Sequence, residues 1–186
     1  MTRSINNNPN SVLSLREMIA AAMMTAVTAV CAWITVPAAV PFTMQTFALF
    51  CSVLLLGGKG GFFSLLTYIL IGAAGVPVFS GFKGGPGVLL GTTGGYIIGF
   101  LFMPLIFLAA EKFFGSRIIP QIAALLLGLL VCYAFGTAWF IHVSTNAVTL
   151  EKALKWCVIP FIIPDLIKLV LALILTSRVK KHIKLT

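Results

Sequence analysis

Residues 156–176 read WCVIPFIIPDLIKLVLALILT, an apolar run long enough to cross a bilayer that nevertheless contains Asp165 and Lys168. Three positions apart, these two side chains share one face of a helix. A charged side chain at membrane depth costs about 2.5–3.5 kcal/mol on insertion scales. The two charges must therefore meet polar partners there. We expect them either to serve a ligand or to neutralise each other and anchor this helix.

The composition excludes an ordinary soluble domain. Of the 186 residues, 60% are hydrophobic and 9% are charged, whereas about a quarter of the residues in a soluble domain are charged. We predict an all-α integral protein of the cell (cytoplasmic) membrane, surrounded by lipid. The net charge is +9, but the basic residues lie mainly at the chain ends and in short connectors, which indicates topology and no nucleic-acid partner.

The apolar stretches give the number of crossings. A helix needs roughly 20 apolar residues to span a bilayer, and four stretches satisfy this: 18–36, 88–110, 118–141 and 156–176. Two shorter stretches, 46–56 and 62–74, flank GGKGG at 57–61. We expect two short tilted helices joined by a tight turn, although one broken span or a re-entrant hairpin would also fit.

The charge distribution favours six helices over five. With six helices, the second and third short, and with both termini cytoplasmic, nine basic residues are cytoplasmic and three are outside. The cytoplasmic ones are Arg3, Arg16, Lys59, Lys112, Arg117, Arg178, Lys180, Lys181 and Lys184, and the outer ones are Lys83, Lys152 and Lys155. We predict a single transmembrane domain over 1–186, with a flexible polar N-terminus at 1–14.

Most of the 17 glycines lie between Gly57 and Gly99. Gly91, Gly95 and Gly99 recur every fourth residue, a spacing that allows close helix packing, either within the bundle or at a dimer face. Ala22, Ala26 and Ala29 form a similar small face in the first span, again for packing within the bundle or against a partner. Residues 75–87 are rich in Gly and Pro and cannot continue as helix, so we expect an ordered outer loop long enough to act as a lid.

Polar side chains gather in the predicted outer half of the bundle. The candidates are Thr43, Gln45, Thr93, Tyr96, Asn146, Asp165 and Lys168. Within apolar walls these groups predict a pocket for a small, polar and anionic ligand. Simpler roles stay open: Thr43 and Gln45 could cap a helix, and Tyr96 could pack with its hydroxyl bonded to a neighbour.

The sequence offers no constellation for catalysis. His142 and His182 are predicted on opposite sides of the membrane, so they cannot share a metal. No strand–turn motif holds a nucleophilic serine, and neither glycine-rich loop ends as a phosphate-binding loop does. Cys31, Cys51, Cys132 and Cys157 lack C-x-x-C spacing and are expected to be packing residues. We therefore expect neither enzymatic activity nor a cofactor.

Five motifs occur in order along nearly the whole chain: PFTMQ at 41–45, GGKGG at 57–61, residues 68–75 followed by VPVF at 76–79, TGGY at 93–96, and Pro160-Phe161 with Asp165 and Lys168. Together they resemble the BioY family, the biotin-specific substrate-binding (S) components of energy-coupling-factor (ECF) transporters. The resemblance implies a six-helix protein that captures biotin from outside with high affinity. It also implies uptake together with one transmembrane coupling protein and two ATPase subunits.

The resemblance and the chemistry of biotin assign roles to the candidate residues. Asp165 is expected to accept a ureido N–H, while Lys168 either meets the ureido carbonyl or holds Asp165 in place. Lys83 and the backbone groups around Gly85 to Gly87 are expected to face the carboxylate. The remaining expected ligand contacts are Thr43, Gln45, Phe79, Thr93, Tyr96 and Asn146. In such families the small face of the first helix, here Ala22 and Ala26 extended by Ala29, contacts the coupling protein.

One alternative function follows from Asp165 alone. Carboxylates inside the membrane often serve proton relays. A stand-alone proton-coupled secondary transporter of a small carboxylate would use Asp165 in this way and would need no ATPase.

Overall fold

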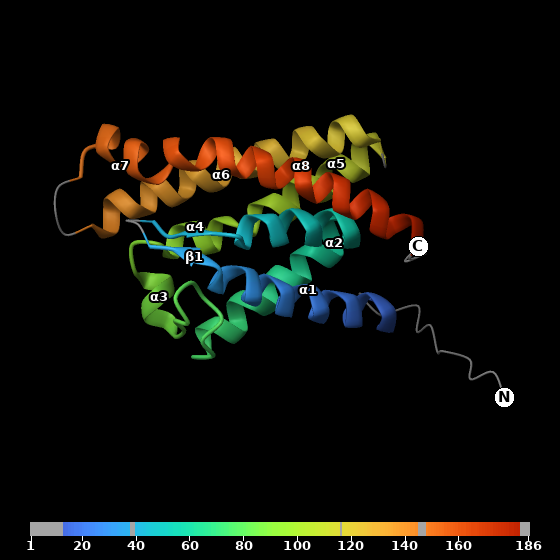
Figure 1. Cartoon of the computed structure of the whole chain (residues 1–186), viewed down its shortest axis with the longest axis horizontal. Coiled ribbons are helices and arrows are strands. Elements are labelled where there is room, and N and C mark those ends of the chain that lie inside the picture. Colours follow the sequence, from blue (N-terminus) through green and yellow to red (C-terminus); the bar gives the residue numbers. More distant parts are fainter. Residues whose placement is uncertain (1–12, 38–39, 116, 145–147, 183–186) are drawn as a thin grey trace.

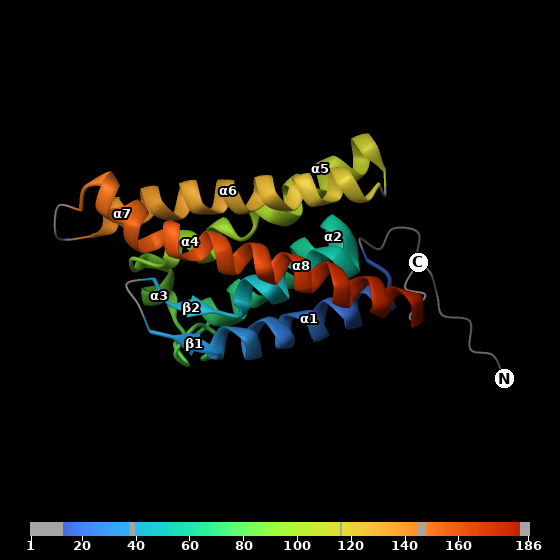
Figure 2. The ribbon, with the colours of Figure 1, turned by 45° about the horizontal axis from the view of Figure 1, so that its top comes forward.

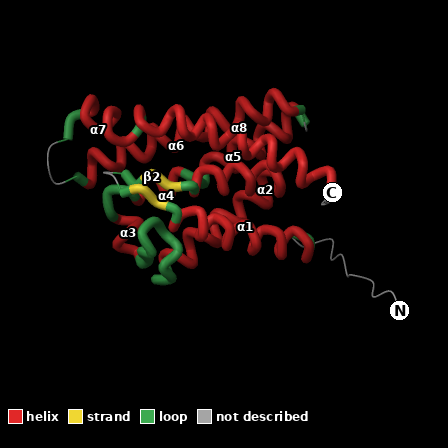
Figure 3. The backbone as a smooth tube through the Cα atoms, viewed as in Figure 1, coloured by secondary structure: helices red, strands yellow, loops and turns green. Residues whose placement is uncertain are grey.

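The computed structural model describes residues 13–37, 40–115, 117–144 and 148–182. Helices dominate the tube view in Figure 3, and the one small sheet within the described residues is a two-stranded ribbon. Five helical stretches of the described chain are long and apolar enough to cross a membrane: Leu15–Trp33, Gln45–Ala73, Gly94–Phe114, Ile118–Val143 and Leu150–Lys181. The all-α membrane class predicted from composition is therefore confirmed.

Helix α1 (Leu15–Trp33) begins with a capping box, in which the Ser14 side chain accepts from Glu17 N and the Glu17 carboxylate accepts from Ser14 N at 2.7 Å. The chain after α1 forms strand β1 (Thr35–Val36), which pairs antiparallel with β2 (Phe42–Thr43). The ribbon thereby delivers the PFTMQ motif directly to the start of helix α2. Nothing in the hydropathy pattern had predicted this ribbon.

Helix α2 (Gln45–Ala73) reverses direction at Gly57, where φ is 72° and ψ is 177°. The arm before Gly57 runs toward the end of the bundle where α1 starts, and the arm after it runs back (Figure 1). Glycine adopts positive φ without steric cost, and Gly58 N donates to Glu111 Oε2 at 2.8 Å. The two short arms agree with the expected pair of short helices joined by a tight turn.

The stretch 88–110, predicted as one span, is broken. It comprises α3 (Pro86–Leu90), α4 (Gly94–Gly99) and α5 (Phe102–Phe114). Gly91 takes an extended conformation with φ −77° and ψ −178°, and a Cβ on Gly94 would overlap the Leu89 carbonyl. The chain thus folds back on itself between α3 and α4, a tight path that an apolar composition does not reveal. The prediction of a continuous helix here was wrong.

The stretch 156–176 is not continuous either. Helix α7 (Leu150–Cys157) ends at Val158, where φ is −124° and ψ is −60°, and α8 (Ile159–His182) follows. Trp156 therefore belongs to the short α7 and not to the long helix that carries Asp165. Residue 158 is as apolar as its neighbours, so the break has no signal in hydropathy.

Helix α6 (Ile118–Val143) packs against α4 and α5 along facing glycines. A Cβ on Gly95 would overlap Trp139, and one on Gly99 would lie 3.1 Å from Cys132 Sγ. Gly95 and Gly99 therefore serve packing within the bundle, the first of the two roles considered for their spacing. Gly91 lies outside α4, and a Cβ on it would lie near α3 and not near α6, although its carbonyl accepts a hydrogen bond from Trp139 Nε1 at 3.0 Å.

Helix α2 is the centre of the bundle, since it contacts α1 on one side and both α5 and α8 on the other. In Figure 2, α1 and α6 lie on opposite sides with α2 and α8 between them. The ribbon, α3 and α7 gather at one end, here called the ribbon end, and α1 starts and α8 ends at the other.

Candidate functional site

A cavity of about 400 Å³ lies at the ribbon end. Its lining comes from the ribbon, the start of α2, the loop at 75–85, α3, α4, α6 and α8. Eight of the ten predicted ligand residues line it, namely Thr43, Gln45, Phe79, Lys83, Thr93, Tyr96, Asp165 and Lys168. Residues between Val40 and Lys168 that are far apart in the sequence thus converge on one space of the size that small-molecule sites have.

Asp165 and Lys168 form a buried ion pair on α8. Lys168 Nζ lies 2.8 Å from Asp165 Oδ1, and the two side chains are 6% and 1% exposed, respectively. Their spacing of three residues on the helix produces this contact, as the sequence predicted. Pairing offsets part of the cost of burying two charges, but a buried pair is seldom a net stabiliser.

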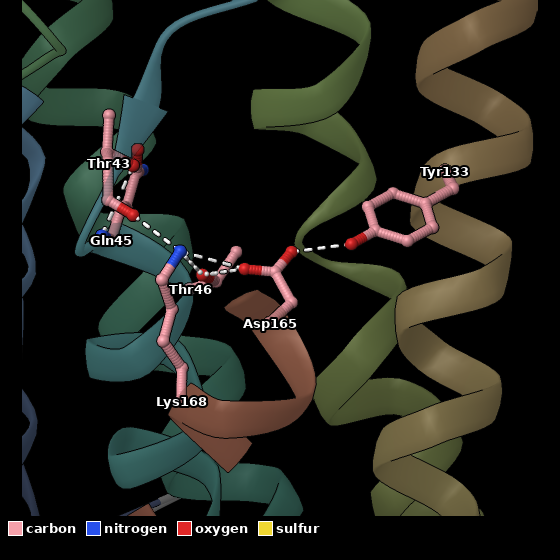
Figure 4. Close-up of polar contacts among 6 residues, drawn as sticks. All are labelled: Thr43, Gln45, Thr46, Tyr133, Asp165 and Lys168. Atoms are coloured by element: carbon pink, nitrogen blue, oxygen red, sulfur yellow. Dashed lines mark hydrogen bonds and ion pairs between the residues drawn. The ribbon is translucent and has the colours of Figure 1, made fainter. Parts of the chain in front are cut away.

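Further polar partners complete the pair (Figure 4). Lys168 Nζ also donates to the Thr43 carbonyl at 2.7 Å and to Thr46 Oγ1 at 3.0 Å. The Thr46 hydroxyl donates to Asp165 Oδ1 at 2.8 Å, and the Tyr133 hydroxyl donates to Asp165 Oδ2 at 2.6 Å. The network therefore joins β2, α2, α6 and α8 at the cavity wall.

The ammonium group of Lys168 has used its three donors within this network. It also lies 4.4 Å from the centre of the Phe42 ring, a cation–π distance. Of the two roles considered for Lys168, holding Asp165 in place is the one that the geometry satisfies directly.

Gln45 has an unused donor at the cavity. It is 5% exposed, and its Nε2 has no hydrogen-bond partner among the described residues. Its backbone N donates to Thr43 Oγ1 at 3.2 Å. The N-cap of α2 is Met44, which makes no side-chain cap, so neither Thr43 nor Gln45 is the N-cap residue that the capping alternative considered. Ser52 Oγ is also buried without a partner in the described chain, but it does not line the cavity. A buried, unpaired amide facing a cavity is a candidate ligand contact.

Tyr96 combines packing with a place on the cavity wall. Its hydroxyl lies 2.9 Å from Thr137 Oγ1, and a Cβ on Gly136 would overlap its ring. The hydroxyl thus has a protein neighbour, as the packing alternative proposed. Thr93, at the start of α4, lines the same wall.

The loop at residues 75–85 covers one side of the cavity and is tied to the bundle. Phe79 is buried, packs edge-on against Tyr68 at 5.5 Å between ring centres, and lines the cavity. Trp33 Nε1 donates to the Pro77 carbonyl at 2.9 Å, and the Trp33 ring stacks on Phe82. These contacts order the loop, as predicted. The loop is shorter than the predicted 75–87, however, because Pro86 and Gly87 form the start of α3, where proline is tolerated in the first turn of a helix.

Lys83 and Gly85 differ in their placement. Lys83 is exposed and lines the cavity. Gly85 does not line it; its backbone N donates to the Gly72 carbonyl at 2.7 Å. Asn146, the remaining predicted ligand residue, lies outside the described residues.

Two cavity residues of the polar network, Thr46 and Tyr133, were missing from the sequence prediction. Tyr133 lies in a helix whose window is strongly apolar, and a hydroxyl at such depth needs a partner. This need for a partner was the signal in the sequence that could have identified Tyr133 as a site residue. Thr46 directly follows Gln45 but was counted as part of an apolar run.

The small face of α1 is divided. Ala22 and Ala26 are exposed, whereas Ala29 is 7% exposed and packs with Tyr68 and Ile69 in the core. Ala22 and Ala26 are therefore accessible to a second protein, and Ala29 is not. Exposed Met18, Ile19 and Met23 surround them.

The fold and the cavity define a multi-pass membrane protein with an internal site for a small ligand that carries hydrogen-bonding groups. Within the described residues, no group of three or more His, Cys, Asp or Glu could hold a metal ion. A scan against known protein families matches the BioY family over residues 3–185. The chain belongs to the BioY family.

Similar proteins cover almost the whole chain. It is 40% identical over 172 residues to the biotin transporter BioY of Thermotoga maritima, covering 90% of this chain and 97% of the relative. It is 38% identical over 169 residues to the probable biotin transporter BioY of Pyrococcus horikoshii, covering 90% and 98%. Among solved structures it resembles the S-component for biotin from an ECF-type ABC transporter, with a TM-score of 0.80, 27% identity and coverage of 96% of this chain and 95% of that chain.

These matches confirm three predictions from the sequence. The resemblance to the BioY family was correct. The family is one of transporters, so the chain is not an enzyme. The chain is also a multi-pass protein of the cell membrane, as its composition indicated.

Proposed function

We propose that this chain captures biotin with high affinity and serves biotin uptake across the cytoplasmic membrane as the substrate-specific subunit of an ECF-type ABC transporter. The observation that carries the proposal is the cavity of about 400 Å³ that holds the Asp165–Lys168 pair and the unpaired Gln45 amide. Relatives named as biotin transporters support the choice of ligand. The proposal requires no cofactor.

The ligand contacts follow from the chemistry of biotin. Its ureido ring carries a carbonyl acceptor and two N–H donors, so Asp165 accepts an N–H and Gln45 Nε2 donates to an acceptor. Apolar walls from Phe79, Phe100 and Phe161 suit the thiophane ring and the valeryl chain. The ammonium of Lys83 meets the carboxylate, together with the backbone of Gly87, which lines the cavity where Gly85 does not. Secondary contacts come from Thr43, Thr93, Tyr96 and Asn146.

Six crossings with both termini in the cytoplasm fit this fold. The proposal counts each arm of α2 as one short crossing, which the reversal at Gly57 supports. Arg16 at the start of α1, Lys59 in the second arm of α2 and Arg178 near the end of α8 then lie on the cytoplasmic side. The cavity opens outward, with Trp33 near the outer interface.

The partners follow from the transporter class. One transmembrane coupling protein contacts the exposed Ala22 and Ala26 of α1, where small side chains allow a close helix approach. Two ATPase subunits supply the energy. The absence of a phosphate-binding loop motif from this sequence supports the assignment of ATP hydrolysis to partners.

Calorimetric titration of the detergent-purified chain with biotin tests the proposal. We expect nanomolar affinity with one site per chain, and loss of most of this affinity in Asp165→Asn. Absence of biotin binding by folded protein would overturn the proposal. Reconstituted vesicles distinguish the alternative function, because uptake that collapses with the proton gradient and needs no ATPase would favour a secondary transporter.

A further inference from the structure

Tyr133 makes a contact that none of the roles described above requires. It lies on α6 and is 9% exposed, and its hydroxyl donates to Asp165 Oδ2 at 2.6 Å. Both residues line the cavity. In Figure 4 the phenol approaches Asp165 from the side opposite Lys168. The carboxylate is therefore held from two sides by residues of different helices.

The donors on Asp165 are unevenly shared between its two oxygens. A carboxylate offers about four acceptor positions, two on each oxygen. Oδ1 accepts from Thr46 Oγ1 and from Lys168 Nζ, both at 2.8 Å, so its two positions are filled. Among the described residues Tyr133 is the one donor to Oδ2. One acceptor position of Asp165 is left, and it is on Oδ2.

We propose that Tyr133 is a positioning residue of the biotin site, whose hydroxyl fixes Asp165 so that the carboxylate presents a single open acceptor position to one ligand N–H. The inference rests on the proposed function and deepens it. The two N–H groups of a cyclic urea point in different directions, so a site with one open position meets one of them. Without the phenol, Oδ2 has two open positions and the carboxylate is no longer held from α6.

A double-mutant cycle in a biotin titration tests this role. Tyr133→Phe removes one hydrogen bond to a charged group, and we expect biotin affinity to fall roughly tenfold. Because Tyr133 acts through Asp165, the same change made in an Asp165→Asn background should alter the residual affinity less than twofold. Equal losses in both backgrounds, or no loss from Tyr133→Phe alone, would overturn the inference.

Thr25→Val is the matched control. Thr25 Oγ1 donates to the Ser64 carbonyl at 2.9 Å between α1 and α2, and it is as buried as Tyr133 but does not line the cavity. We expect unchanged biotin affinity in this variant. That result would show that losing a buried hydroxyl hydrogen bond elsewhere in the bundle does not by itself weaken biotin binding. A tenfold loss in Thr25→Val would contradict a specific role for Tyr133.

If Tyr133→Phe does not fold, 3-fluorotyrosine at position 133 replaces it, because fluorination makes the phenol a stronger donor with little change of shape. We expect at least a twofold change in biotin affinity with Asp165 present and none with Asn at that position. An unchanged affinity in both backgrounds would refute the inference. Failure of the unmodified chain to bind biotin would instead refute the proposed function, so the two failures are distinguishable.

Discussion

Replacement of Lys168 by Met tests whether the buried pair is a structural anchor or a part of the binding site. The substitution keeps most of the side-chain volume but removes the ammonium group. Three hydrogen bonds are lost, to the Thr43 carbonyl, Thr46 Oγ1 and Asp165 Oδ1. Asp165, which is 1% exposed, then keeps only Thr46 and Tyr133 as donors among the described residues.

The loss of stability in Lys168→Met follows from the buried charge of Asp165, which no longer has an opposite charge beside it. Breaking a buried pair by removing one partner typically costs 3–5 kcal/mol. Two donors remain on Asp165, so we expect the lower end, about 3 kcal/mol of unfolding free energy. In the double variant Asp165→Asn/Lys168→Met no net charge is left, and replacing a buried pair by uncharged groups is often close to neutral. The unpaired Thr43 carbonyl still costs about 1 kcal/mol, so the double variant should recover about 2 kcal/mol.

Denaturant titration in detergent measures these free energies, and a biotin titration of the same samples measures affinity. Lys155→Met is the control, because Lys155 and Glu151 form an exposed pair at 2.7 Å with side chains 63% and 76% exposed, and such pairs contribute about 0–1 kcal/mol. We expect the double variant to regain stability but not biotin binding. If Lys168→Met were as stable as the original chain, or if Asp165→Asn/Lys168→Met bound biotin normally, this reasoning would be refuted.

Three further substitutions have expected outcomes. Gln45→Leu should weaken biotin binding roughly tenfold without lowering the melting temperature, because the amide donor is buried and has no partner in the described part of the chain. Unchanged affinity in calorimetry would exclude its ligand role. Gly57→Ala should cost about 1–2 kcal/mol or more, because φ is +72° and a Cβ would lie 3.2 Å from a carboxylate oxygen of α5. Gly115→Ala is the control in denaturant titrations, because Gly115 has a similar φ of +66° but no atom near the added Cβ. An equal loss of unfolding free energy in both variants would mean that backbone strain acts without any contribution from the close contact at Gly57. Gly136→Ala should displace the Tyr96 ring, which should lower the free energy of unfolding by about 1–3 kcal/mol and weaken biotin binding. Unchanged stability and unchanged affinity in the same assays would contradict the packing described.

The sequence predicted the membrane class and the Asp165–Lys168 pair because both depend on the cost of placing charge in an apolar medium. That cost is a property of residue types and spacing. The sequence also placed Gln45 correctly at the start of α2, because an apolar stretch follows it directly.

The breaks in the helices could not be predicted in the same way. The fold-back near Gly91 and the break at Val158 depend on backbone angles and on which atoms lie nearby. A run of apolar residues has the same hydropathy whether or not a helix is interrupted within it. Tyr133 was missed for a related reason, because its partner Asp165 lies 32 residues away and no periodicity connects the two.

The polar network is difficult to explain as a device for stability alone. Apolar residues of similar volume in place of a buried pair are often neutral or stabilising, and the surrounding cavity wall is largely apolar. Among the residues that the structure describes, the network instead leaves two polar groups without a full set of partners in the same cavity: one acceptor position on Asp165 Oδ2 and the donor Gln45 Nε2. A fold that fills every other position around Asp165 and leaves one donor and one acceptor open is complementary to a ligand that carries both. Ligand binding would thus remove the two desolvation costs that the empty site retains, and we expect the chain to be measurably more stable with biotin bound.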